Sequence, residues 1–231
     1  MIYINNIETT LEHIAEQVRK CQLCPLARLR THAVPGEGNP HTEVLFVGEG
    51  PGQKEDDRGR PFVGASGKFL GEMLASVGFT REDVFITNVV KCRPPGNRDP
   101  EEVEIETCSG TYLNLQVSLI KPKIIVTLGR HSLKWFLKEA VPISRVHGQL
   151  KAVVNKKTGT AQYILPLYHP AAALYNGSQR AVHLEDFKKI PAILEKIKTG
   201  ALPWPPHALS DVPAATAQEQ PEEHKQTGLK F

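Results

Sequence analysis

Short, continuous runs of apolar residues alternate along this chain with segments whose apolar residues recur at helical spacing. The runs are rich in valine and isoleucine and predict four buried strands, at residues 43–48, 84–90, 123–129 and 162–167. Three further segments carry their apolar residues on one helical face, at residues 66–78, 99–120 and 131–140. Continuous apolar strands that alternate with helices are typical of a parallel sheet covered by helices on both faces. The pattern therefore predicts an α/β fold.

The apolar pattern ends near residue 200. Residues 201–231 contain five prolines and many alanine, glutamine and glutamate residues. Such a segment cannot bury enough apolar surface to offset its conformational entropy, so we expect a disordered tail. Residues 1–200 are expected to form one folded domain.

Composition narrows the classes of protein without choosing one. The 231 residues contain no run of about 18 apolar residues, which excludes a membrane-spanning helix. The first residues lack the basic and apolar regions of a secretory signal, so we expect a cytoplasmic protein, and we expect a monomer. The net charge of +3 permits binding to nucleic acid but does not require it.

The segments that follow the predicted strands hold most of the residues suited to chemistry. Ligands of parallel α/β folds bind beyond the carboxyl ends of the strands. His169 and Asn88 each close such a strand, although a structural histidine and a turn-capping asparagine also fit. Phe62 lies in the first of these segments and is either a pocket ring or a core residue. The glycine loop 48–52 lacks the spacing of a dinucleotide or phosphate loop and instead allows close backbone approach to a small ligand.

Four cysteines form a second candidate site. Cys21 and Cys24 are separated by two residues, and Cys92 and Cys108 follow much later. Buried thiols or disulfides are the alternative, but without a secretory signal we expect a reducing compartment, where disulfides are rare. Four thiolates are the ligand set of a tetrahedral zinc ion or of an iron–sulfur cluster. The spacing therefore predicts a metal centre and leaves both metals open.

Three segments of the chain read GEGPGQKEDDRGRPFVGASGKFL (48–70), VFITNVVKCRPPGNR (84–98) and LYHPAAAL (167–174). Together with the order of the four cysteines, they resemble the family 4 uracil-DNA glycosylases, from about Cys21 to about Lys198. The resemblance implies a three-layer α/β/α domain with a central, mostly parallel four-stranded sheet. It also implies a four-iron, four-sulfur cluster on the four cysteines. The implied activity is removal of uracil from DNA, which leaves free uracil and an abasic site.

The resemblance also assigns roles at the strand ends. His169 would donate a hydrogen bond to uracil O2, where negative charge develops as the glycosidic bond breaks. Asn88 would read uracil N3–H and O4, and Phe62 would stack on the extruded base.

Two carboxylates are candidates for the remaining chemistry. Glu49 and Gly50 would line the uracil pocket, and Gly50 stands where the better-known branch of uracil glycosylases has a water-positioning aspartate. We therefore expect Glu49 or Glu55 to orient water or to screen the sugar cation. As an alternative, Glu55 occupies the space that a thymine methyl group needs.

Contacts to DNA follow from the same resemblance. Lys91, Arg93 and Arg98 lie near the expected mouth of the pocket, where they would contact phosphates. Leu174 is expected to enter the base stack as a wedge, although a hydrophobic anchor for its loop is the alternative. No lysine is placed as a Schiff-base nucleophile, so we expect a monofunctional enzyme that leaves the strand uncut.

The last residues are a separate candidate for partner binding. Gln226, Leu229 and Phe231 match the short Q-x-x-L-x-F peptides that bind bacterial sliding clamps. A second function stands beside the enzyme: an iron–sulfur protein that binds DNA or a repair partner on the same scaffold without cleaving. The joint presence of His169, Asn88 and Phe62 favours the enzyme.

Overall fold

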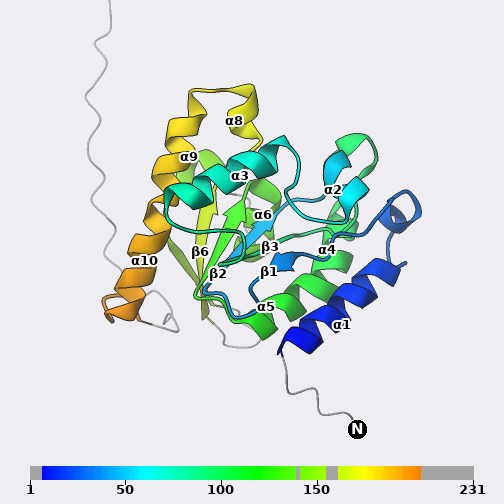
Figure 1. Ribbon diagram of the computed structural model, residues 1–231, viewed down its shortest axis with the longest axis horizontal. Helices are drawn as coiled ribbons and strands as arrows, with labels where there is room; N and C mark the ends of the chain where they lie inside the picture. The colour runs from blue at the N-terminus through cyan, green and yellow to red at the C-terminus, as the bar shows by residue number, and fades with distance from the viewer. Residues whose placement is uncertain (1–6, 139–140, 155–160, 204–231) are drawn as a thin grey trace, which may run out of the picture.

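The computed structural model describes residues 7–138, 141–154 and 161–203, and these residues form three layers (Figure 1). The middle layer is a six-stranded sheet with the order β1-β3-β2-β4-β6-β5. The strands are β1 (Glu37–Gly38), β2 (Val44–Gly48), β3 (Phe85–Asn88), β4 (Ile124–Leu128), β5 (Lys151–Val154) and β6 (Ala161–Leu167).

The four predicted strands form the parallel centre of this sheet. β2 pairs in parallel with β3 and with β4, and β4 pairs in parallel with β6. The predicted number of four strands is too small, because β1 and β5 add antiparallel edges to β3 and β6. β1 has only two residues, and β5 is only half-buried. Neither edge carries the run of buried apolar side chains that marks a strand in a sequence.

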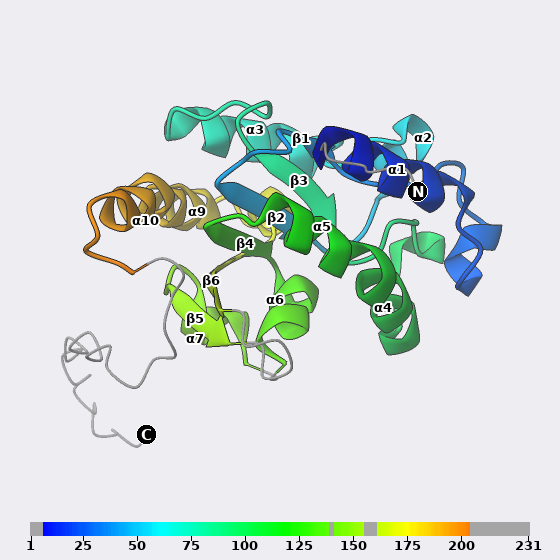
Figure 2. The same ribbon diagram turned by 90° about the horizontal axis from the view of Figure 1, so that it is seen from below.

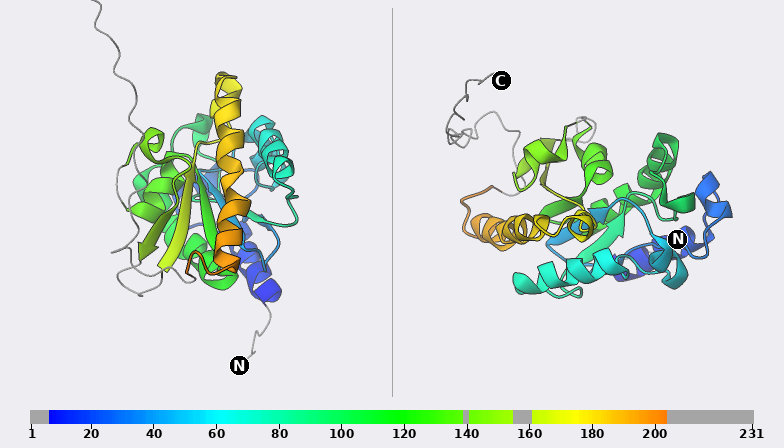
Figure 3. Two further views of the ribbon diagram at one scale, coloured as in Figure 1. Left: turned by 90° about the vertical axis from the view of Figure 1, so that its left-hand side faces the viewer. Right: turned by 90° about the horizontal axis from the view of Figure 1, so that it is seen from above.

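Helices cover both faces of the sheet (Figure 2). On one face α3, α9 and α10 pack on strand residues such as Phe46 and Val126, and α9 and α10 follow each other in one line (Figure 3). On the other face α1, α5 and α6 pack on the alternate residues, such as Leu45 and Ile125. The bounds of these helices are α1 (Ile7–Lys20), α3 (Ala65–Ser76), α5 (Asn114–Ile120), α6 (Arg130–Leu137), α9 (Gln179–Phe187) and α10 (Lys189–Lys198).

The predicted helices are all present, with small differences at their ends. The segment 99–120 becomes α4 (Glu102–Cys108), a π-helical turn (Ser109–Leu113) and α5 in direct succession. The segment 131–140 begins at Arg130, and residues 139–140 lie outside the described residues. A short helix, α7 (Ile143–Val146), precedes β5.

The carboxyl ends of the parallel strands lie at one edge of the sheet. α2 (Gln53–Arg58) follows β2 there, and α8 (Ala172–Tyr175) follows β6. Gly48 at the end of β2 is paired with Asn88 at the end of β3. This register brings together the loops in which a ligand site of an α/β fold is expected.

Within the described residues, no helix has both the length and the apolar character needed to cross a membrane. The predicted tail lies outside the described residues from 204 onward, and so does the clamp peptide with Gln226, Leu229 and Phe231.

Candidate active site

A pocket of about 380 Å³ opens at the carboxyl edge of the sheet. Its walls come from the loops after β2, β3 and β6. All six residues predicted for catalysis or uracil binding line it, namely Glu49, Gly50, Glu55, Phe62, Asn88 and His169. The structure therefore brings together residues that are as many as 120 positions apart in the sequence.

Asn88 lies at the base of the pocket with an unpaired acceptor. The residue is 1% exposed, and its Oδ1 atom has no hydrogen-bond partner among the described residues. Buried polar atoms are nearly always paired in folded proteins, so this oxygen fits a donor supplied by a ligand. A Cβ atom at Gly48 would lie 2.4 Å from Asn88 Oδ1 and 2.7 Å from the ring of Phe62. The glycine at the end of β2 therefore keeps the space in front of the amide open.

His169 presents a neutral imidazole to the pocket. Its pKa is lowered to about 4, mainly by burial and to a lesser extent by the nearby His183, whereas Glu55 opposes the shift. The backbone N–H of Ala171 donates to His169 Nδ1 over 3.2 Å. A neutral ring that accepts at Nδ1 carries its proton on Nε2, so His169 is a hydrogen-bond donor at that atom. His183 Nε2 in turn contacts the carbonyl oxygen of His169 at 3.2 Å.

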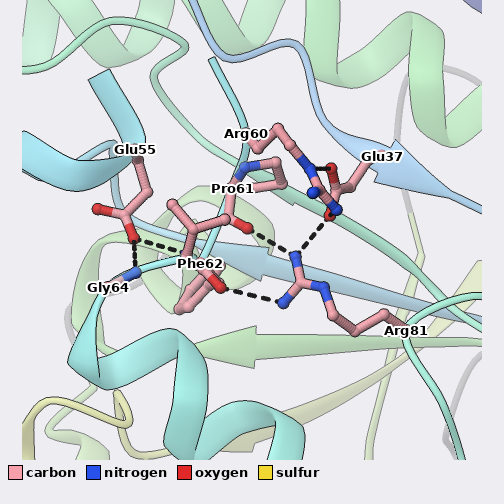
Figure 4. Close-up of polar contacts among 8 residues, drawn as sticks. Glu37, Glu55, Arg60, Pro61, Phe62, Gly64 and Arg81 are labelled. Atoms are coloured by element: carbon pink, nitrogen blue, oxygen red, sulfur yellow. Dashed lines mark hydrogen bonds and ion pairs between the residues drawn. The ribbon is translucent and has the colours of Figure 1, made fainter. Parts of the chain in front are cut away.

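Phe62 is held next to His169 by an unusual backbone. Its φ is 52°, its side chain is 6% exposed, and its ring centroid lies 5.7 Å from that of His169. The Glu55 carboxylate accepts hydrogen bonds from the backbone N–H groups of Val63 and Gly64, both at 2.8 Å (Figure 4). Glu55 therefore anchors the loop that carries the ring.

Glu49 lies in a second group of titratable side chains at the pocket wall. Burial raises the pKa of Glu49, and Asp99 adds to this rise, whereas His131 and Arg130 oppose it. Glu49 Oε2 is 3.7 Å from His131 Nε2, and Asp99 Oδ1 is 3.5 Å from the same nitrogen. Asp99 and His131 are not among the residues predicted from the sequence. Both follow predicted strands within the Gly-, Pro- and His-rich segments, and this position is the signal that could have identified them.

The four cysteines converge on a small apolar cavity between α1, the loop after β3 and α4. All four thiols are free, and burial raises the pKa values of three of them, that of Cys108 to about 12. N–H groups point at the sulfur atoms: Arg30 donates to Cys92 Sγ at 3.1 Å, and the backbone N–H of Lys91 donates to Cys108 Sγ at 3.3 Å. Protein donors of this kind commonly surround sulfur ligands of a metal centre.

Lys91 is not a phosphate contact, which corrects the prediction. Its side chain is 1% exposed, and its ammonium group donates to Thr87 Oγ1 at 2.5 Å, to the carbonyl oxygen of Asn88 at 2.7 Å and to Gln116 Oε1 at 2.9 Å. Burial lowers the pKa of Lys91 to about 8, with Cys108 and Cys92 opposing the shift. The sequence shows a basic residue near the mouth but does not show that its side chain turns inward.

The other predicted DNA contacts lie at the surface. Arg98 lines the pocket and forms ion pairs with Glu104 at 2.8 Å and with Glu101 at 3.4 Å. Arg93 donates to Asn97 Oδ1 at 2.8 Å. Leu174 lies on α8 and is 45% exposed, so its side chain is available to a partner.

Comparison of the sequence with known proteins identifies the family that has this fold and pocket. The family model described as "Uracil DNA glycosylase superfamily" matches residues 35–196, and this chain belongs to that superfamily. The type-4 uracil-DNA glycosylase of Sulfurisphaera tokodaii is 54% identical over 78% of this chain and 83% of the relative. The type-4 enzymes of Saccharolobus solfataricus and Thermotoga maritima are 50% and 44% identical, over 80% and 82% of this chain and 86% and 97% of the relatives. Within the superfamily, the chain belongs to the type-4 uracil-DNA glycosylases.

The Lys91→Met variant tests the buried role of the ammonium group. The substitution leaves three buried acceptors without their donor, and we expect the free energy of unfolding to fall by at least about 2 kcal/mol. Urea denaturation measures this loss, with Arg93→Met as the control at a more exposed site. Unchanged stability together with a weaker salt dependence of DNA binding would instead support a phosphate contact.

The protonation of His169 can be measured directly. An NMR titration is expected to give a midpoint near pH 4 rather than near 6.5. Because the pKa is lowered in the folded protein, the unfolded chain takes up this proton first as the pH falls. The His169 contribution should therefore destabilise the fold progressively between about pH 6.5 and 4. His169→Gln should remove this part of the pH dependence, and a native midpoint above pH 6 would contradict a neutral ring.

Proposed function

We infer that this protein is a uracil-DNA glycosylase, which hydrolyses the N-glycosidic bond of deoxyuridine extruded from DNA. The products are free uracil and an abasic site, as in base excision repair. One observation carries this function: the unpaired amide oxygen of Asn88 lies with the neutral ring of His169 and the ring of Phe62 in a single pocket. The family of the chain supports the same function.

Asn88 accounts for the choice of uracil over cytosine. Its Oδ1 accepts from N3–H of uracil, and its Nδ2 donates to O4. Cytosine presents an acceptor at N3 and a donor at the 4-position, so both contacts would be mismatched. A buried polar group left without a partner costs about 1–3 kcal/mol, which is a factor of roughly 10 to 100 in recognition.

His169 stabilises the departing base. Uracil leaves as an anion with charge on O2, and Nε2–H of His169 donates a hydrogen bond that strengthens as this charge develops. The low pKa keeps the ring neutral, so its role is donation of a hydrogen bond rather than transfer of a proton. Phe62 supplies a stacking surface that offsets the stacking lost when the base leaves the duplex.

Glu49 is the better candidate for orienting water or screening the sugar cation. Glu55 Oε1 already accepts two backbone hydrogen bonds, whereas no backbone donor holds Glu49 in this way within the described residues. Glu55 instead fixes the Phe62 loop, and occupation of the space that a thymine methyl group needs is its proposed second role. No lysine lines the pocket within the described residues, which supports a monofunctional reaction.

Arg93 and Arg98 are proposed to contact phosphates, and Leu174 is proposed to fill the gap in the base stack. The exposure of Leu174, five positions after His169 in the chain, supports this role. Tyr175, the next residue, is 92% exposed and adds an aromatic ring to the same surface.

A four-iron, four-sulfur cluster is proposed at Cys21, Cys24, Cys92 and Cys108. Four thiolates that converge on one cavity are a ligand set for either a zinc ion or a cluster. The similarity of the chain to the type-4 enzymes favours the cluster. The cluster would hold together α1, α4 and the segment between Asn88 and the DNA surface. Its proposed role is structural.

The binding protein without catalysis is the less favoured function, because a pocket that only binds DNA does not need an unpaired amide beside a neutral imidazole. The clamp peptide, the monomeric state and the cytoplasmic location stay predictions from the sequence.

Excision of uracil tests the proposed function. Purified protein is incubated with an oligonucleotide containing one deoxyuridine, and alkali then cleaves the abasic strand. We expect cleavage only after alkali, and we expect Asn88→Ala to lower the single-turnover rate by roughly 10- to 100-fold. Asn114→Ala, at an exposed site on α5, is the control and should match the parent protein. Release of no uracil by the parent protein would refute the assignment.

The composition of the metal centre is open to a separate test. The purified protein is expected to absorb visible light and to contain iron and acid-labile sulfide in equal amounts. Cys108→Ser should lose both and lower the melting temperature. A protein that contains zinc without sulfide would contradict the cluster.

A further inference from the structure

The backbone at Phe62 is strained. A φ of 52° places this residue in the left-handed region, which is rare for a bulky side chain and costs free energy. Such a conformation persists only where the surroundings determine it. Gly67 is part of these surroundings, because a Cβ atom there would lie 1.9 Å from the carbonyl oxygen of Phe62.

Charged side chains hold this backbone from both sides (Figure 4). Before the turn, the Arg81 guanidinium donates to the carbonyl oxygen of Pro61 at 2.6 Å and to that of Phe62 at 3.0 Å. After the turn, Glu55 accepts from the backbone N–H groups of Val63 and Gly64. A cation thus holds two consecutive carbonyls and an anion holds the two following amides. Hydrogen bonds to charged groups are stronger than neutral ones, which suits them to oppose backbone strain.

Arg81 is itself held in place by Glu37. The distance from Arg81 to Glu37 Oε1 is 2.7 Å, and Arg60 donates to Glu37 Oε2 at 2.7 Å. Burial alone would raise the pKa of Glu37, but the hydrogen bonds from Arg60 and Arg81 lower it, so the carboxylate stays charged at neutral pH. Glu37 lies on β1, which connects this group to the edge of the sheet.

We propose that Arg81 is a positioning residue that fixes the Phe62 ring as the stacking surface for the extruded base, with Glu37 as its anchor. The proposal rests on the proposed function, since it needs a base to stack on Phe62. The proposal also assigns a role at the site to the two-residue strand β1, because β1 carries Glu37, the carboxylate that orients Arg81. Lysine cannot replace arginine here, because one ammonium lacks the planar fork that reaches two carbonyls and a carboxylate.

Binding of free uracil is the first test. Inhibition of excision by free uracil is measured for the parent protein, Arg81→Met and Arg81→Lys. We expect the inhibition constant to rise about tenfold in Arg81→Met, comparable to the loss of one base–aromatic stacking contact, and to rise by a similar factor in Arg81→Lys. The control is Arg60→Met, because Arg60 also pairs with Glu37 but touches neither carbonyl; its constant should change less than about twofold. Equal losses in Arg60→Met and Arg81→Met would overturn the proposal.

A double-mutant cycle separates positioning from general stability. If Arg81 acts through the ring, Phe62→Leu and Arg81→Met should weaken uracil binding by similar factors, and the double variant should lose no more than either single one. A merely destabilising change would instead multiply the two losses. Melting temperatures of all variants establish that each is folded at the assay temperature, and Arg81→Lys replaces Arg81→Met in the cycle if the latter is unfolded.

The position of the ring can also be observed without uracil. In protein labelled with fluorophenylalanine, the fluorine NMR signal of Phe62 is identified by its loss in Phe62→Leu. We expect one sharp signal in the parent protein and a shifted or broadened signal in Arg81→Met. An unchanged signal would refute the positioning role even if the parent protein excises uracil. A changed signal in a protein that does not excise uracil would refute only the proposed function.

Discussion

The parallel pairing of β2 with β3 is the contact on which the site depends. Its register sets Gly48 opposite Asn88, so the strand next to the amide ends in a residue without a side chain. The Asn88 side chain and the Phe62 ring then share the space that a Cβ atom at Gly48 would fill. A slip of one residue would turn Asn88 to the other face of the sheet and close the pocket. The strand register thus places Asn88 and the open space beside it, and the loops add the other side chains of the pocket.

Buried charges in this protein hold loops rather than bind DNA. Lys91 joins the end of β3 to α5 through Gln116, and it directly precedes Cys92 in the chain. Glu55 and Arg81 do the same for the Phe62 loop. A buried charge with several partners is costly to displace, because each partner would lose a strong hydrogen bond. Such charges therefore stiffen the segments that carry the pocket residues.

Sequence patterns predicted the four central strands, three of the helical segments and the six pocket residues on which the proposed function rests, because continuous apolar runs, helical spacing and distinctive motifs at strand ends leave clear signals. The helices α1, α9 and α10 were not predicted. They did not predict the direction of side chains. Lys91 lies between Val90 and Cys92, and nothing in that pattern shows that it is buried. Arg81 and Glu37 are 44 residues apart and resemble ordinary surface charges in the sequence. Their roles depend on the backbone of a third segment, the left-handed turn at Phe62, which only the folded structure reveals.

The pocket carries two features that cost free energy, the oxygen of Asn88, which no described residue pairs, and the strained backbone of Phe62. Neither cost is relieved within the described part of the chain. A uracil base would relieve the first by donating N3–H, whereas the second remains in the bound state and is opposed by Arg81 and Glu55 throughout. The protein thus keeps the ring and the amide in place before the base arrives. The base then meets a preorganised site, and little of its binding free energy is spent on ordering the protein. More of that free energy is left for the contact from His169 to O2, which is strongest in the transition state.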